Sequence, residues 1–183
     1  MLISRSNWHT KYPANFQLIA AMNPCKCGYL ADLNRQCSKA PMCGQTYLTK
    51  ISGPILDRLS MHVEVANSNT YNHVGAENES SDIVMKRITI ARNRQLARYK
   101  TQGIITNARV NGQLLLKSAA LDNVGQKLLD KTAEKFKISM RGYTTILRVA
   151  LTIADLEGSE YVLSHHIAES ISYRLTDYTS GLR

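Results

Sequence analysis

The 183-residue sequence lacks the features that most often identify an exported protein, a membrane protein or a single-motif enzyme. No apolar run approaches the length of a membrane span, and the N-terminus lacks the apolar core and cleavage site of a signal peptide. The motifs GxxxxGK[ST], GxGxxG, HExxH and GxSxG are absent, as are internal repeats and low-complexity tracts. We therefore expect a soluble, cytoplasmic protein whose function no single motif identifies.

The composition is that of a folded and basic protein. Hydrophobic residues make up 44% of the chain, which is too high for general disorder. The formal net charge of +9 favours anionic partners such as nucleic acid or nucleotide phosphates. Because the basic residues are spread out, with only a modest concentration between Lys86 and Lys100, a solvated basic surface is an equally simple interpretation.

All four cysteines lie close together in the chain. In a chain without an export signal, clustered thiols indicate a metal site before disulfides. Four thiolates match the closed tetrahedral coordination of structural zinc, which leaves no position for water. The first pair is Cys-x-Cys and not the commoner Cys-x-x-Cys, so free thiols remain the alternative. The sequence predicts a structural Zn²⁺ or an equivalent metal held by Cys25, Cys27, Cys37 and Cys43.

The first third of the chain has the pattern of strands, and the remainder has the pattern of helices. Residues Phe16–Met22 form a short apolar run between turn signals, and Leu59–Val65 alternates apolar with polar residues, so both segments are predicted strands. Between them we expect a short helix and a turn around Gly53-Pro54. Residues 67–81 are polar and are predicted to form a linker between a first domain, 1–66, and a helical second domain, 82–183.

Four helices are predicted in the second domain from apolar residues at helical spacing. The first begins at Ser80 or Ser81, the third ends at Gly158, and the last has Ser164 as its N-cap. His165 and His166 are adjacent on that last helix and should point in different directions, which favours surface or packing roles over metal binding. The four segments are 80–99, 121–136, 139–158 and 164–174.

Polar residues stand at several predicted element boundaries. Asn23 follows a buried run, and ligands of open α/β sheets bind beyond the carboxyl ends of strands. Arg58 precedes the second strand and can offer its guanidinium to phosphate oxygens. Arg141 and Arg148 lie two helical turns apart on one face, with Arg141 in the first turn, where anions are favoured. Each has a simpler alternative: a turn for Asn23, a salt bridge with Asp57 for Arg58, and solvation for the other two.

The ordered combination of these segments is more specific than its parts. The chain contains, in order, "FQLIAAMNPCKCGYL", "YLTKISGPILDRLSMHVEV", "RQLARY" and "SMRGYTTILRVALTIADLEGSEYV". From about Ser4 to Arg174 it resembles the C-terminal half of the magnesium-chelatase-like AAA+ proteins of the YifB/ComM group. The resemblance implies the last strands of a parallel α/β core with a four-cysteine insertion, 25–43, followed by an all-α lid.

The resemblance also implies a function and residue roles. Members form rings, commonly hexameric, that use ATP and Mg²⁺ to do mechanical work, and ComM-type members act on DNA as helicases in branch migration during recombination. Asn23 matches the sensor-1 asparagine, which orients the attacking water. Arg58 matches the arginine finger, offered to a neighbouring subunit's nucleotide. Arg141 best matches the sensor-2 arginine, with Arg148 as the alternative.

One departure from the family pattern bears on activity. The phosphate-loop lysine, the Mg²⁺-binding hydroxyl and the acidic strand end that family members carry upstream of sensor-1 are absent from these 183 residues. We therefore expect a C-terminal piece of a longer protein or the product of a split reading frame, inactive unless it meets a separate N-terminal half. Two other functions stay open: a stand-alone zinc-stabilised DNA-binding or adaptor module, and a metal-chelatase subunit.

Overall fold

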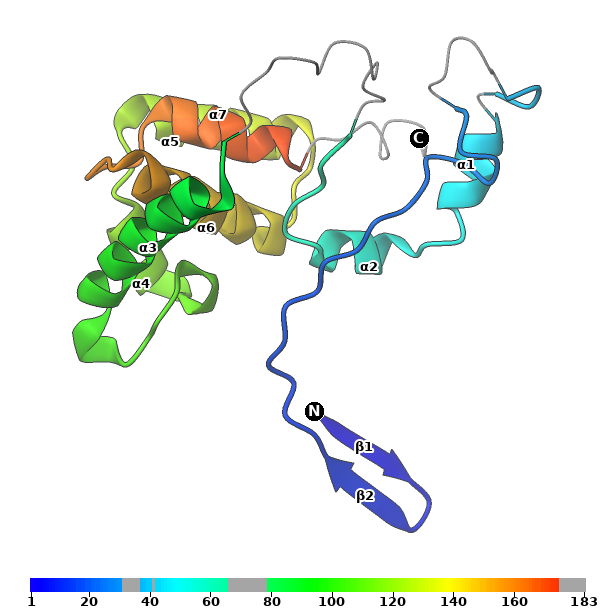
Figure 1. Ribbon diagram of the computed structural model, residues 1–183, viewed down its shortest axis with the longest axis horizontal. Helices are drawn as coiled ribbons and strands as arrows, with labels where there is room; N and C mark the ends of the chain where they lie inside the picture. The colour runs from blue at the N-terminus through cyan, green and yellow to red at the C-terminus, as the bar shows by residue number, and fades with distance from the viewer. Residues whose placement is uncertain (31–36, 41, 66–78, 175–183) are drawn as a thin grey trace. The chain divides into compact units, whose positions relative to one another are not determined.

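The computed structural model describes residues 1–30, 37–40, 42–65 and 79–174. The chain divides into two compact units, Met1–Tyr47 and Leu48–Arg183. The first unit contains an antiparallel hairpin of β1 (Leu2–Arg5) and β2 (Trp8–Lys11), in which Leu2 is opposite Lys11 and Arg5 is opposite Trp8. Its one helix among the described residues, α1 (Met42–Leu48), ends at the boundary between the units (Figure 1).

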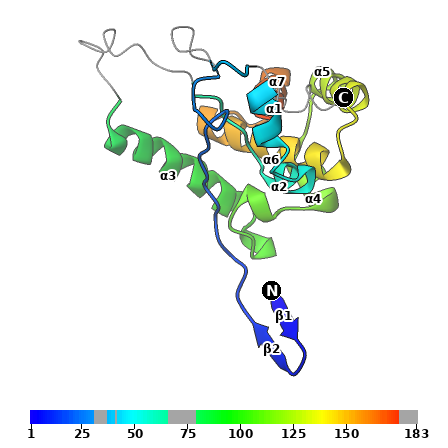
Figure 2. The ribbon, with the colours of Figure 1, turned by 90° about the vertical axis from the view of Figure 1, so that its right-hand side faces the viewer.

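The second unit is helical. Its elements are α2 (Gly53–Arg58), α3 (Ser81–Arg98), α4 (Gly112–Ala119), α5 (Asn123–Lys135), α6 (Met140–Glu157) and α7 (Ser164–Ser172), with 3₁₀ turns η2 (Lys100–Gln102) and η3 (Asn107–Arg109). Helix α6 is central and packs against α3, α4 and α7, while α5 packs against α7 (Figure 2). The core between them is aliphatic and contains Leu115, Leu129, Ile146, Leu147, Leu151 and Ile167.

Local sequence explains where these helices begin and end. The Asp122 carboxylate accepts a hydrogen bond from the Gly125 N–H (2.8 Å) at the start of α5, and the Ser139 hydroxyl accepts one from the Gly142 N–H (3.1 Å) at the start of α6. Helix α6 ends at Gly158, whose φ of +88° is a left-handed conformation that glycine adopts without strain. The predicted helices over 80–99, 121–136, 139–158 and 164–174 are therefore confirmed, with small differences at their ends.

Four local features differ from the predictions. Ser164 is the first residue of α7, and Leu163, whose backbone is extended, is its N-cap; the Leu163 N–H donates to the His166 ring (2.9 Å). Gly53 and Pro54 open α2 and do not form a separate turn, since proline is well suited to a first helical turn. Helix α4 was not expected at all. The apolar residues that predicted α3 are Ile83, Ile88, Ala91 and Leu96, and of these only Ala91 is buried.

The two predicted strands are also wrong. Residues Phe16–Met22 carry no strand pairing and are exposed, with Ile19 85% accessible. Residues Leu59–Val65 are likewise unpaired, and Val65 is 86% accessible. A parallel strand of this apolar type needs hydrogen-bonding neighbours and helices over both faces, and the described ranges supply neither. The part of the chain that the structure describes is thus mainly helical with a small antiparallel sheet, and the expected parallel strands are not seen in it.

The predicted boundary between the domains lies mostly outside the described residues. The polar segment 67–81 overlaps 66–78, and only its last residues, which lead into α3, can be followed. The boundaries 1–66 and 82–183 therefore stay predictions. Among the helices that the structure describes, none is both long and apolar enough to cross a membrane.

A buried polar network ties α3 to α6. The fully buried Asp155 carboxylate pairs with the guanidinium of Arg98, whose Nη1 lies 3.0 Å from its Oδ2. Asn107 joins the network by donating to Asp155 (2.9 Å) and to Thr152 (3.0 Å), and it accepts from the Tyr99 hydroxyl (2.9 Å). The buried charge therefore has a charged partner and hydrogen bonds to its oxygens, which is the condition under which such a group is tolerated in a core.

Candidate functional site

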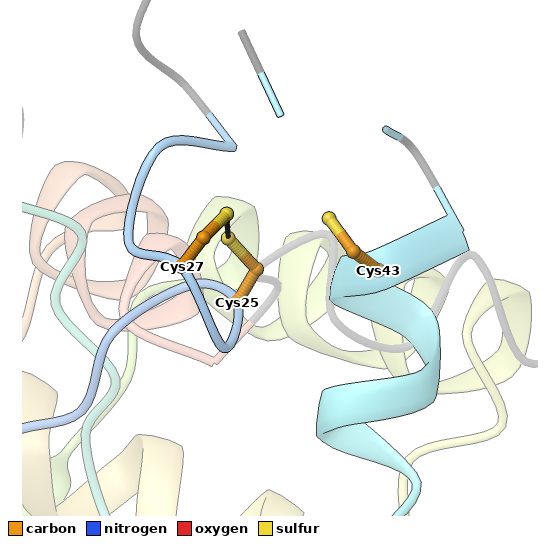
Figure 3. A group of neighbouring side chains, drawn as sticks. All are labelled: Cys25, Cys27 and Cys43. Carbon is orange, nitrogen blue, oxygen red and sulfur yellow. Dashed lines mark hydrogen bonds between the residues drawn. The ribbon is translucent and has the colours of Figure 1, made fainter. Parts of the chain in front are cut away.

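Three of the four cysteines converge in the first unit. The sulfur atoms of Cys25, Cys27 and Cys43 all lie within 4.8 Å of one another (Figure 3). The thiols of Cys25 and Cys27 share a hydrogen bond of 3.2 Å, and none of the four cysteines is in a disulfide. The fourth, Cys37, is not part of this group of mutually close sulfurs, although it lies near enough to Cys43 and Cys27 for them to lower its pKa. The structure therefore brings together three of the four thiols that the sequence analysis selected, and the four-cysteine metal site stays a prediction.

A tight turn and a helix start hold these thiols. The Gly28 N–H donates to the Cys25 carbonyl (3.1 Å), and Gly28 has a φ of +82°, so a side chain here would strain the turn that carries Cys25 and Cys27. Cys43 comes from the first turn of α1, where its N–H donates to the Lys39 carbonyl (2.9 Å). At Gly44 a Cβ would lie 2.6 Å from a Leu30 methyl group, so the close packing of the loop on α1 needs glycine.

The close approach of the thiols shifts their pKa values in opposite directions. Burial opposes ionisation of Cys25, but hydrogen bonds from Cys27 and from nearby backbone outweigh it and lower the pKa of Cys25 to about 7. The hydrogen bond with Cys37, followed by burial, raises the pKa of Cys43 to about 12. The pKa of Cys37 is lowered, chiefly by its hydrogen bond with Cys43. The lowered pKa values of Cys25 and Cys37 thus favour their thiolate forms, which accept hydrogen bonds from the neighbouring thiols.

This donor set fits a structural metal ion. Thiolate sulfur is a preferred ligand of zinc, and four such ligands close the coordination sphere. A divalent cation at this place would take over the role of the shared protons, because it stabilises all four sulfurs in the thiolate form. Cys25 has no exposed surface and Cys27 is exposed, so the cluster lies at the edge of the unit and is open to an ion from solvent.

Asn23 lies directly before the thiol turn. Its side chain is exposed, and its amide group lies 3.9 Å from the position a Cβ would take on Gly28. The segment that leads to it is an extended loop and not the expected strand. Asn23 belongs to the first unit, whereas Arg58, Arg141 and Arg148 belong to the second.

Arg58 ends α2 with its guanidinium exposed. Its Nη1 donates to the Pro54 carbonyl (2.7 Å), so the side chain folds back along its own helix. The alternative salt bridge with Asp57 is not formed: Asp57 pairs instead with Arg174, whose Nη2 lies 2.6 Å from its Oδ1. Among the described residues no acidic group neutralises Arg58, which leaves its charge available to an anion.

Arg141 and Arg148 differ in their surroundings although both lie on α6. Arg148 is half-buried, donates to the Val110 carbonyl (2.9 Å) and contacts the Asn111 side chain. Burial, followed by the nearby charge of Arg141, lowers the pKa of Arg148. Arg141 is exposed in the first turn of the helix. The structure therefore uses Arg148 to hold the loop before α4, and it leaves Arg141 exposed to solvent at a helix N-terminus.

A second cluster joins the end of α6 to the start of α7. His165 lies 3.0 Å from the Glu157 carboxylate, and buried His166 contacts the same carboxylate, so the expectation that the two rings point apart was wrong. The His166 Nδ1 accepts the Leu163 N–H, which places the ring proton on Nε2, toward Glu157. A metal would need that nitrogen's lone pair, so we interpret the cluster as a hydrogen-bonded helix junction.

Comparison with known proteins gives consistent matches along the chain. The model of the family described as magnesium chelatase, subunit ChlI C-terminal, matches residues 78–174, and the model described as magnesium chelatase, subunit ChlI, matches residues 1–73. The chain is 35% identical over 177 residues to the uncharacterized protein YifB of Salmonella typhimurium, covering 96% of this chain and 34% of the relative.

Two further relatives give the same result. The chain is 34% identical over 176 residues to the competence protein ComM of Haemophilus influenzae, covering 95% of this chain and 33% of the relative. It is 33% identical over 177 residues to YifB of Escherichia coli, covering 96% and 34%. The chain thus spans about a third of the length of the relatives it matches. The resemblance to the magnesium-chelatase-like YifB/ComM group is confirmed.

Proposed function

The chain belongs to the magnesium chelatase subunit ChlI family, and from this membership we propose that it is part of an AAA+ ATPase of the ComM type that remodels DNA. The observation that carries the proposal is the order of the two matches, 1–73 and then 78–174, together with the similarity to ComM over 95% of the chain. In this proposal the chain works in a ring, commonly hexameric in AAA+ proteins, and ATP and Mg²⁺ are bound by a complete core.

The residues of this chain would act on the terminal phosphate by position and charge. Phosphoryl transfer requires little covalent chemistry from the protein, so orientation of water and neutralisation of the developing charge account for most of the acceleration. Asn23 would orient the attacking water, and Arg58 would reach the nucleotide of the neighbouring subunit. The exposure of Arg58 and its lack of an acidic partner in the described ranges support that role.

Arg141 is our choice for the lid arginine. Its place in the first turn of α6 adds the partial positive charge of the helix N-terminus to its own. Arg148 is committed to Val110 and Asn111, so freeing it for a phosphate would expose the unpaired Val110 carbonyl. The choice is testable, because only replacement of Arg141 should weaken nucleotide affinity without loss of stability.

We propose that Cys25, Cys27, Cys37 and Cys43 hold one structural Zn²⁺. Protein purified under reducing conditions without added zinc is expected to contain about one equivalent of zinc, since a closed set of four thiolates binds one ion. Replacement of Cys25 or Cys43 by serine should remove the metal and unfold the first unit, as measured by elemental analysis and circular dichroism.

The control for the zinc experiment is Ser38→Ala, a change in the same loop that removes a hydroxyl but no sulfur. It should retain the metal. Well-folded, reduced protein that contains no metal, and that gains none on addition of Zn²⁺, would rule out this assignment.

The proposed DNA substrate can be tested on the isolated chain. Helix α3 carries exposed basic residues, among them Lys86 and Arg92, and the chain has a net charge of +9. We expect weak binding to duplex DNA at low ionic strength that falls steeply with added salt, because neutralising phosphates releases counterions. Fluorescence anisotropy of a labelled duplex measures it, and Arg92→Gln should reduce the salt slope by about one unit.

The same experiment separates the ATPase from a stand-alone DNA-binding or adaptor module. An adaptor should bind one DNA structure tightly as a monomer, whereas a ring subunit should bind weakly until it is assembled. Tight, structure-specific binding by the monomer would favour the adaptor. Absence of binding even at low salt would remove DNA from the proposal.

A further inference from the structure

One arginine that the sequence analysis did not select contacts the backbone on both sides of Arg58. Arg174 follows α7, and its side chain is only 10% exposed. Its Nη1 donates to the Leu59 carbonyl (2.8 Å) and lies 3.4 Å from the Asp57 carbonyl, and its Nη2 pairs with the Asp57 carboxylate (2.6 Å). Both residues adjacent to Arg58 are therefore held by a single guanidinium more than 110 residues away in the chain.

Neighbouring contacts hold the same segment, residues 57–62, which we call the strap. The His62 N–H donates to the carbonyl of Tyr173 (2.8 Å), the residue before Arg174. The Asp57 carboxylate also accepts from Ser139 (3.4 Å), the N-cap of α6. Figure 1 shows the end of α2 at the N-terminal end of α6. Within the second unit, the strap is thus held at its start by Ser139 and Arg174 and at its end by Tyr173.

The first turn of α6 is shaped to accept Arg174. At Gly142 an added Cβ would lie 3.3 Å from the Arg174 Nη2 and 2.6 Å from an Ile138 methyl group. Any larger residue would therefore push against the guanidinium that holds Asp57. Gly142 is adjacent to Arg141, and Asp57 and Leu59 are adjacent to Arg58. The side chain of Arg174 therefore connects the segments that carry the two proposed phosphate-binding arginines.

We propose that Arg174 is a positioning residue for Arg58: it fixes the strap to the first turn of α6, so that a displacement of this turn moves the finger. The inference rests on the proposed role of Arg58 in ATP hydrolysis. A lysine could replace the ion pair with Asp57 but offers a single nitrogen, whereas the planar guanidinium reaches the Asp57 carboxylate and the Leu59 carbonyl at once.

Amide hydrogen exchange of the full 183-residue chain tests the inference. In Arg174→Gln we expect amides of the strap to exchange about tenfold faster or more, the change that follows from losing hydrogen bonds to a charged group. Amides in the core of α6 should change less than about twofold. Arg174→Lys should lie between the two, and Arg92→Gln, which removes an exposed arginine, should leave the strap unchanged.

Two results would overturn the inference. Unchanged strap exchange in Arg174→Gln would show that Arg174 does not hold the strap. Equal acceleration in the strap and in α6 would show that Arg174 only stabilises the whole unit, and Arg174→Lys gives the same comparison if the glutamine variant does not fold. The experiment uses no nucleotide, so its outcome is independent of whether Arg58 acts in hydrolysis, which the Arg58→Ala variant tests separately.

Discussion

Replacement of Arg58 by alanine is expected to lower ATP hydrolysis by at least about 10³-fold, the range in which arginine fingers act. The measurement needs a complete ATP site, so the assay uses a chimera in which this chain replaces the matching 176-residue region of the Haemophilus influenzae ComM. The loss should appear in kcat with nucleotide affinity nearly unchanged, because the finger contacts charge that develops in the transition state.

The control is Lys127→Ala, which removes an exposed basic side chain of α5 that has no part in the proposed sites. It should retain hydrolysis within about twofold, since surface substitutions away from a site have small effects. A loss of less than tenfold in the Arg58→Ala chimera, with assembly intact, would contradict the proposed role. The isolated 183-residue chain is expected to show no hydrolysis, because it contains no GxxxxGK[ST] motif.

Replacement of Asp155 by alanine is expected to destabilise the second unit by about 3 kcal/mol, the lower end of the range for removing one partner of a buried ion pair. The lower end applies because the Arg98 side chain is 24% exposed and water can reach its guanidinium once the carboxylate is lost. The Asn107 amide would lose one of its two acceptors as well. Urea denaturation followed by circular dichroism should show a lower midpoint with an unchanged slope.

Glu160→Ala is the control for this experiment, since Glu160 is an exposed acid in the loop that follows the same helix. Its effect should stay within about 0.5 kcal/mol. A loss below about 1 kcal/mol in Asp155→Ala would mean that the network contributes little beyond what water can replace.

The helices were predictable because their signals are local. Ser139 caps α6 and Gly158 ends it, and the apolar residues between them recur at the helical period and form the core. The strands were not predictable in the same way. Apolar character at Phe16–Met22 and alternation at Leu59–Val65 are compatible with strands, but a strand also needs partners, and none pairs with either segment in the described ranges.

The candidate site likewise has features that the local sequence predicts and features that depend on residues far apart in the chain. Four clustered cysteines can be recognised from the sequence, and the structure places the sulfurs of three of them, Cys25, Cys27 and Cys43, within 4.8 Å of one another. The pairing of Asp57 with Arg174 cannot be read from the chain, because the two lie 117 residues apart and neither has an unusual neighbour. The burial of Asp155 could have been predicted from the sequence. It lies on the apolar face of α6 beside Ala154 and Leu151, and a buried acid needs a partner within the core.

The central claim is that Arg58 completes the ATP site of a neighbouring subunit, and mixed rings test it most directly. Chimeras with Asn23→Ala and with Arg58→Ala should each be inactive. Mixing equal amounts should restore about a quarter of wild-type hydrolysis, because each intact site needs Asn23 from one subunit and Arg58 from the next, and each is supplied half of the time. No recovery in mixed rings of confirmed composition would contradict the claim, since it would place both residues in the same subunit's site or in none.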